Sequence, residues 1–173
     1  MRCLACRQSL TGVRVDASVN SDASVQHLSL RRAGWESDRA AIESVRRRVF
    51  IEEQGIPERE EWDATDLTCR HVLALMGNRD VVGTGRVDAT GNIGRVAVIP
   101  PFRGTGIGTA IMRCLVHLAR DAGLDEVHLN AQASAVGFYE RLGFQPEGPE
   151  FDEVGIPHRR MRLRLDGLNG PGD

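Results

Sequence analysis

Short apolar segments and longer amphipathic segments alternate along the chain from residue 25 onward. The short segments have the hydrophobic pattern of β-strands and span residues 26–32, 70–76, 81–88, 93–99, 126–131 and, as a strand pair, 144–165. The longer segments carry apolar side chains at helical spacing and span residues 36–54, 106–122 and 134–142. Turns at Gly77-Asn78 and Gly91-Asn92 separate three consecutive strands, which predicts antiparallel hairpins. The order β-α-βββ-α-β-α-ββ predicts a mixed α/β fold with a largely antiparallel central sheet flanked by helices.

The length of 173 residues fits one domain, which we expect to span residues 25–165. Residues 1–24 have no sustained apolar period, so we expect a disordered tail or an incorrectly extended start, and the question of a targeting role stays open. Residues 166–173 are expected to be a flexible C-terminus. Cys3 and Cys6 form a lone C-x-x-C without a partner motif, which we interpret as chance and not as a metal or redox site.

The charge balance excludes some classes of partner. The chain has 22 Lys+Arg and 24 Asp+Glu, so nothing in its charge predicts binding to nucleic acid or to a membrane surface. No apolar run approaches transmembrane length, and the four scattered cysteines suit a reducing compartment. We therefore expect a cytoplasmic protein, present as a monomer or a homodimer.

The glycine-rich joint at residues 103–108 (RGTGIG) lies between the strand 93–99 and the helix 106–122. Three glycines allow the backbone to curl so that successive N–H groups face one hollow, and the helix start adds unpaired donors and a positive dipole end. The joint therefore predicts a pyrophosphate site. A dinucleotide-binding G-x-G-x-x-G loop is the structural rival, but the required third glycine is absent and the hairpins before the joint contradict a βαβ start.

Two motifs carry a family resemblance. Residues 96–108 (VAVIPPFRGTGIG) resemble the acetyl-CoA signature of the GNAT superfamily of N-acetyltransferases, Q/R-x-x-G-x-G/A. Residues 135–144 (AVGFYERLGF) are similar to the second hallmark of that superfamily, a short helix that ends in Y-E-x-L-G-F. Residues 52–57 (EEQGIP) and 155–158 (GIPH) resemble a small subgroup of bacterial acetyltransferases. The resemblance covers roughly residues 26–165 and implies the GNAT fold.

The resemblance also implies acetyl-CoA as the acetyl-donor cosubstrate and no metal. The pyrophosphate would be held by the glycine-rich joint, through Arg103, Gly104, Thr105, Gly106, Ile107, Gly108 and Thr109. The pantetheine arm would pair with a strand edge that splays from its neighbour, at Val96, Ala97 and Val98, and a backbone N–H of this edge would polarise the acetyl carbonyl. The superfamily often has Asn near the end of the next strand, where this chain offers Asn130 and Gln132.

Tyr139 is the only tyrosine of the chain and stands where the superfamily protonates the departing thiolate. The resemblance therefore implies that Tyr139 is the catalytic acid. The alternative is that Phe138 and Tyr139 only pack as an aromatic pair on a short helix.

The general base is less well defined by the residues. An amine with a pKa near 10.4 is almost fully protonated at neutral pH, so a base or a water chain must assist. The candidates are Glu52, Glu53, His71 and His158, and Glu53 is the one we predict as catalytic. The alternatives are that the two glutamates are solvated at an exposed helix end and that the two histidines are structural or lie on the surface.

The segment 52–66 contains seven acidic residues and one arginine, Arg59. If Glu52, Glu53, Asp63 and Asp66 border the acceptor groove, the segment favours a cationic amine. The alternative is a solvated acidic loop. The predicted function is acetyl-CoA-dependent transfer of acetyl to a primary amine by direct attack in a ternary complex, since no cysteine is placed to carry the acyl group. The alternative function is a non-catalytic acyl-CoA-binding sensor.

Overall fold

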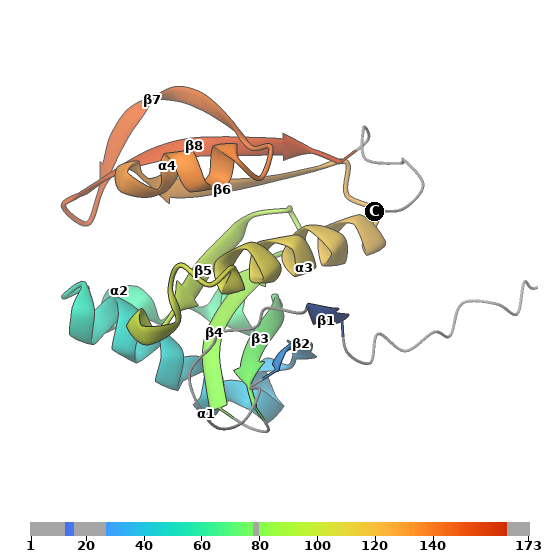
Figure 1. The fold of residues 1–173 in the computed structure, drawn as a ribbon. Coiled ribbons are helices and arrows are strands. Elements are labelled where there is room, and N and C mark those ends of the chain that lie inside the picture. The colour runs from blue at the N-terminus through green and yellow to red at the C-terminus, as the bar shows by residue number, and fades with distance from the viewer. Residues whose placement is uncertain (1–12, 16–26, 78–79, 166–173) are drawn as a thin grey trace, which may run out of the picture.

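The computed structural model describes residues 13–15, 27–77 and 80–165 of the chain. Eight strands form two antiparallel sheets (Figure 1). The larger sheet has the order β1-β2-β3-β4-β5, from β1 (Val13–Val15), β2 (Leu28–Ala33), β3 (Arg70–Met76), β4 (Asp80–Val87) and β5 (Ile93–Val98). The smaller sheet has the order β6-β8-β7, from β6 (Glu126–Gln132), β7 (Gln145–Glu153) and β8 (Ile156–Arg164). The α/β fold predicted from the hydrophobic pattern is confirmed, but its sheet is divided in two.

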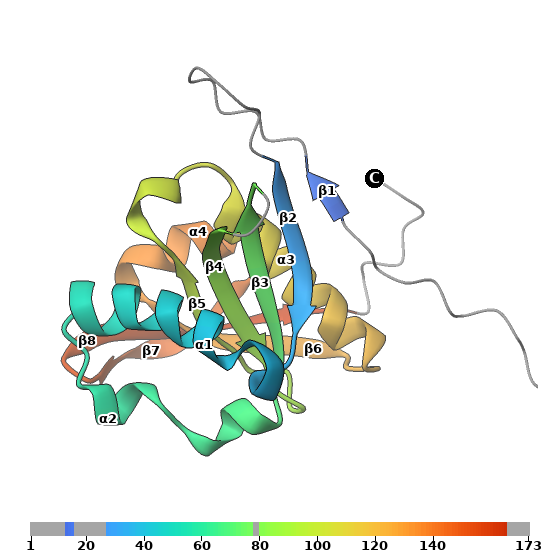
Figure 2. The same cartoon turned by 90° about the horizontal axis from the view of Figure 1, so that it is seen from below.

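The helices cover both faces of the larger sheet. The α-helices are α1 (Trp35–Arg46), α2 (Glu58–Glu61), α3 (Ile107–Asp121) and α4 (Val136–Glu140), and α1 continues as π-helical turns over Arg47–Glu53. Short 3-10 turns occur at Ala64–Leu67, Pro100–Phe102 and Ala133–Ala135. Figure 2 shows α1 and α3 on opposite sides of the sheet, and α4 packs against the smaller sheet.

Glycines in β4 allow α3 to lie close to the sheet. A Cβ atom on Gly83 would be 2.8 Å from Ile111 Cδ1, and one on Gly85 would be 2.9 Å from Leu115 Cδ1. A side chain at either position would therefore force these leucine and isoleucine side chains, or the helix that carries them, to shift. The apolar face of α3, with Ile107, Ile111 and Leu115, is almost fully buried against this surface. The packing fixes the position of the N-terminus of α3, where the glycine-rich joint lies.

The two sheets separate along the edge between β5 and β6. Opposite Gly85, β5 carries one extra residue, and Arg95 adopts a left-handed conformation with φ of 52° there. Near the bulge, β5 and β6 meet at an isolated parallel bridge between Asn92 and His128, where His128 N–H donates to the Gly91 carbonyl at 2.9 Å. Within residues 80–165 no further strand pairing joins β5 to β6. The predicted splaying of the Val96–Val98 edge is confirmed.

The N-terminal segment departs from the expectation of a disordered tail at three residues. Val13–Val15 form β1 and pair with β2, with Val13 opposite Leu30. The rest of the predicted tail, including Cys3 and Cys6, lies outside the described residues, as do Asn78 of the first predicted turn and the predicted flexible C-terminus 166–173. Among the described residues, the helices are all too short or too polar to cross a bilayer.

Candidate active site

The glycine-rich joint presents a row of backbone donors. Gly104 and Gly106 have φ of 75° and 86°, a left-handed conformation that glycine adopts without strain, and the space beside both is open. The first N–H of the helix start that bonds back is that of Ala110, which donates to the Gly106 carbonyl at 3.0 Å. The N–H groups of Gly104 to Thr109 have no acceptor among the described residues. Six consecutive free donors at a helix N-terminus fit a pyrophosphate.

Arg103 is paired and does not point freely into this hollow. Its Nη1 and Nη2 donate to Glu53 Oε1 and Oε2, both at 2.6 Å, and its Nε donates to the Val98 carbonyl at 2.8 Å. The guanidinium lowers the pKa of the Glu53 carboxyl, which makes Glu53 a weaker proton acceptor. Glu53 therefore ties the end of the π-helical turns to the donor loop, and this geometry gives its predicted role as the base no support.

The edge of β5 offers main-chain groups to the cleft between the sheets. Ile99 donates its N–H to the Val82 carbonyl at 3.0 Å, and Ala97 is in register with Thr84. By alternation along the strand, the N–H and C=O of Val98 and the C=O of Val96 point away from β4, toward the side of β6. Since Arg103 takes the Val98 carbonyl, the Val98 N–H and the Val96 carbonyl are the groups available to a ligand.

A pocket with a volume of about 350 Å³ lies between β5 and β6. Its walls come from β5, β6, α4, the β7–β8 hairpin and the segment from Phe50 to Glu61. Val96, Asn130, Gln132, Tyr139 and His158 all line it, so the fold brings together predicted site residues from four separate elements. Glu52 and Glu53 are exposed and are not part of the pocket wall.

Tyr139 links this pocket to the donor loop. Its ring makes edge contacts with Phe138 and Phe144, at centroid distances of 5.0 and 6.0 Å. Phe138 Cζ in turn lies 3.5 Å from the position of a Cβ on Gly108, in the first turn of α3. Burial raises the pKa of Tyr139 to about 12, so the phenol stays protonated throughout the physiological range. Tyr139 therefore both packs as an aromatic pair and presents a protonated phenol at the pocket wall.

Asn130 and Gln132 bridge to other walls of the pocket. Asn130 Nδ2 donates to Glu153 Oε2 at 3.3 Å, and Gln132 Nε2 donates to Gln54 Oε1 at 3.1 Å. The second bond connects β6 to the end of the π-helical turns across the cleft. Their predicted contact with the pantetheine arm stays a prediction.

The two histidine candidates have different environments. His71 is buried beneath Trp35, its Nε2 donates to the Asp66 carbonyl at 2.9 Å, and burial lowers its pKa. It does not reach the pocket. His158 lines the pocket, with Nδ1 at 2.8 Å from the Ile156 carbonyl. A carbonyl oxygen can only accept, so Nδ1 carries the proton, and neutral His158 presents an unprotonated Nε2.

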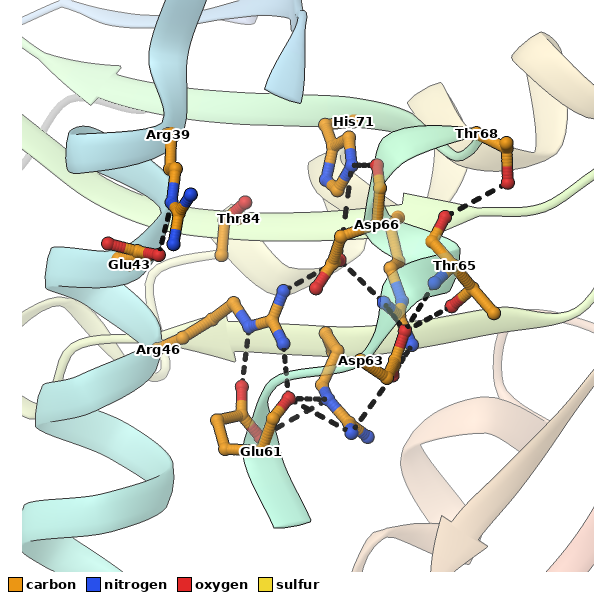
Figure 3. Close-up of polar contacts among 12 residues, drawn as sticks. Arg39, Glu43, Arg46, Glu61, Asp63, Thr65, Asp66, Thr68, His71 and Thr84 are labelled. Atoms are coloured by element: carbon orange, nitrogen blue, oxygen red, sulfur yellow. Dashed lines mark hydrogen bonds and ion pairs between the residues drawn. The ribbon is translucent and has the colours of Figure 1, made fainter. Parts of the chain in front are cut away.

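The acidic segment forms a buried network with arginines (Figure 3). Arg46 is fully buried and bonds to Glu61 Oε1 at 2.5 Å and to Asp66 Oδ1 at 2.8 Å. Arg86 reaches the same Asp66 oxygen and also pairs with Asp63, with 2.7 Å between Arg86 Nη2 and Asp63 Oδ2.

Asp63 and Asp66 do not line the pocket, and arginines pair with both carboxylates, so the condition that these two residues border the groove is not met there. Glu60 and Glu61 of the same segment do line it. The alternative of a solvated loop is wrong for Glu61 and Asp66.

Comparison with known proteins agrees with this arrangement. Residues 43–165 match the family model described as Acetyltransferase (GNAT) domain. The chain belongs to the GNAT acetyltransferase family. The Bacillus subtilis protein YyaT is 37% identical over 144 residues, which cover 80% of this chain and 97% of YyaT.

Solved GNAT structures share the fold. An acyl-CoA N-acyltransferase from Pseudomonas aeruginosa is 29% identical with a TM-score of 0.70, and the match covers 78% of this chain and 98% of that protein. Escherichia coli ElaA is 28% identical, with the same TM-score and the same coverage of both chains. In both cases the matched region covers nearly the full length of the other protein.

Sequence reasoning did not identify the arginines of this GNAT domain that neutralise the acidic segment. Arg46, Arg86 and Arg95 come from α1, β4 and β5, and Arg95 Nε lies 3.2 Å from Glu61 Oε2. One signal was available: Arg46 directly follows Val45 and lies on the buried side of α1. Glu153 of the pocket was also missed, and nothing in its local sequence distinguishes it from the other acidic residues of β7.

Proposed function

We propose that the chain is an acetyl-CoA-dependent N-acetyltransferase that transfers acetyl to a primary amine by direct attack in a ternary complex. The observation that carries the proposal is the combination of six free N–H groups at the start of α3 with an adjacent pocket that contains Tyr139 and His158. Membership of the GNAT family and the likeness to an acyl-CoA N-acyltransferase support it.

The donor would be held by main-chain groups. The N–H groups of Gly104 to Thr109 would bind its pyrophosphate, and the Val98 N–H and Val96 carbonyl would bind the arm along the open edge of β5. Acetyl-CoA supplies a thioester carbonyl that an uncharged amine can attack. The Val98 N–H is a fixed dipole at this edge, so it would stabilise negative charge that develops on the carbonyl oxygen.

Two side chains would handle protons. His158 Nε2 would accept a proton from the incoming ammonium group, because its other ring nitrogen is committed to the Ile156 carbonyl. Tyr139 Oη holds a proton at the pocket wall and would give it to the departing sulfur. His158 thus replaces Glu53 as the proposed base, since among the four candidates it alone lines the pocket.

The test separates donor binding from turnover. Acetyl-CoA should raise the melting temperature of the wild type, because a ligand that binds only the folded state stabilises it. Gly106→Asp should abolish that shift by placing a negative side chain in the hollow. Gly123→Asp is the matched control, since Gly123 also has a positive φ and open space but lies beyond the other end of α3.

Turnover is then measured as free thiol released from acetyl-CoA with a panel of amines. We expect thiol release that depends on the amine and falls at least tenfold in His158→Ala. A donor-induced shift without thiol release from any amine would identify a binding module without acetyltransferase activity. The absence of any shift at millimolar acetyl-CoA would contradict the donor site itself.

A further inference from the structure

The pocket contains one negative charge without a positive partner. Its walls include the carboxylates of Glu60, Glu61 and Glu153. Glu61 pairs with Arg46 and Arg95, and Glu60 Oε1 lies 3.1 Å from Arg59 Nε. Among the described residues, no arginine or histidine lies within ion-pair distance of Glu153, whose Oε2 accepts only the Asn130 amide at 3.3 Å. An amide donor does not neutralise a carboxylate, so Glu153 is left to attract a cation.

The turn next to Glu153 is strained. Val154 and Gly155 connect β7 to β8 with φ of 55° and 74°, between the paired residues Glu153 and Ile156. A two-residue turn with positive φ at both positions favours Asn-Gly, and a β-branched residue at the first position is a conformational outlier. The Val154 side chain does not contribute to the core, because it is 53% exposed. The fold alone therefore gives no reason for valine here.

Val154 is instead part of the pocket wall. Ile156 from the same hairpin and Phe50 and Ile56 from the opposite side provide further apolar surface. Backbone strain that persists at the rim of a pocket points to a ligand contact. The hairpin thus presents a single carboxylate directly beside an apolar lip.

We propose, on the basis of the acetyltransferase function proposed above, that the β7–β8 hairpin selects the acceptor, which is a primary amine with one positive charge on an apolar body. Glu153 binds the ammonium group, and the strained Val154 holds an apolar surface against the body of the substrate. A polyamine would bring a second charge that finds no free carboxylate in the pocket, and an amino sugar would place hydroxyl groups against apolar side chains.

The acceptor panel tests this class directly. 2-Phenylethylamine represents the proposed class, spermidine a polycation and glucosamine a polar amine of one charge. We expect 2-phenylethylamine to have the highest kcat/KM of the three by at least tenfold. A preference for spermidine or glucosamine would overturn the hairpin assignment while leaving the acetyltransferase function intact.

Variants of the hairpin separate the two contacts. Glu153→Gln should weaken calorimetrically measured binding of 2-phenylethylamine by about tenfold and leave acetyl-CoA binding unchanged. The matched control is Glu150→Gln, which removes an exposed carboxylate from the same strand outside the pocket. Equal binding by Glu153→Gln and wild type would overturn the role of Glu153. Because the calorimetry needs no turnover, binding that is lost in Glu153→Gln supports the hairpin assignment even if thiol release fails.

Val154→Asn tests the strain. Asparagine suits the turn, so we expect the melting temperature to rise by about 2–4 °C, while the KM for 2-phenylethylamine rises roughly threefold to tenfold. A rise in melting temperature with unchanged KM would show that Val154 does not contact the substrate. A fall in melting temperature would show that the turn is not strained, and both results would overturn this part of the proposal.

Discussion

Replacement of Arg46 by methionine should destabilise the protein more than any other single arginine substitution in α1. Arg46 is fully buried and donates to Glu61 Oε1 and to Asp66 Oδ1, and a third bond at 2.6 Å reaches the Glu61 carbonyl. Its guanidinium carbon lies 4.9 Å from the ring centroid of Trp62. Methionine fills much of the same space but carries no donor, so two buried carboxylates lose a cation.

The expected loss of stability depends on the ion pairs that remain after the substitution. Removal of one partner of a buried ion pair costs about 3–5 kcal/mol, because the other charge is left without compensation. Arg86 still pairs with Asp66 and Arg95 still pairs with Glu61, which places the expected loss near the lower limit, about 3 kcal/mol. For a domain of this size, 1 kcal/mol corresponds to a shift of about 2–4 °C, so the melting temperature should fall by about 6–12 °C.

The assay is thermal and urea unfolding at neutral pH, with Arg39→Met as the matched control. Arg39 lies on the same helix, its guanidinium carbon is 5.4 Å from the ring centroid of Trp35, and it pairs with Glu43 at 2.6 Å. The Arg39 side chain is 61% exposed, so its loss should cost less than about 1 kcal/mol. If the free energy of unfolding of Arg46→Met lies within 1 kcal/mol of the wild-type value, the buried network does not stabilise the fold and the prediction is wrong.

Three further predictions concern catalysis, packing and pH. Tyr139→Phe should lower kcat by about 100-fold with little change in acetyl-CoA affinity, and unchanged turnover on a good amine would exclude Tyr139 from the chemistry. Gly85→Ala should cost about 1–3 kcal/mol and weaken the acetyl-CoA-induced melting shift, because a Cβ there pushes Leu115 and α3 outward; an unaltered shift would show that the helix position does not matter. Arg31 lowers the pKa of Asp38 from its ordinary value of 3.8 to about 2, so this pair adds stability that is complete above pH 3.8 and is lost as the pH falls toward 2. Arg31→Gln should flatten the fall in stability between pH 4 and pH 2, and unfolding titrations that superimpose in this range would contradict that assignment.

Local periodicity was sufficient to predict most elements of the fold. The strand 70–76 has the bounds of β3, and the helix predicted for 106–122 contains α3, since burial on one face imposes a period that the sequence displays. The division of the sheet follows from a bulge at Arg95, a residue whose positive φ has no sequence signal. The sequence likewise carries no signal for the π-helical turns of Arg47–Glu53, because they continue the helical pattern of α1.

In the site, too, features that depend on neighbouring residues could be predicted from the sequence, and features that depend on distant residues could not. Gly104 and Gly106 were predictable because a left-handed backbone needs glycine at those positions. The pairing of the Glu53 carboxylate could not be predicted, because its partner is Arg103, fifty residues further along the chain. A count of charges detects carboxylates but not their partners, so the sequence could not decide between an acidic segment that borders the groove and a solvated loop, and it gave no sign of the buried arginine pairs.

The buried arginine network also limits how the protein can evolve. Each member of the network, which consists of Arg46, Glu61, Asp66 and Arg86, forms an ion pair with at least one other member. A single substitution therefore leaves a buried charge with too few partners, and only combinations of compensating substitutions are tolerated. Such sites are expected to show strong epistasis in a mutational scan. On the facing side of the pocket, Glu153 and Val154 of the β7–β8 hairpin belong to no such buried ion-pair network among the described residues. A new acceptor range can therefore arise at these two positions one substitution at a time, while the opposite wall is inherited almost unchanged.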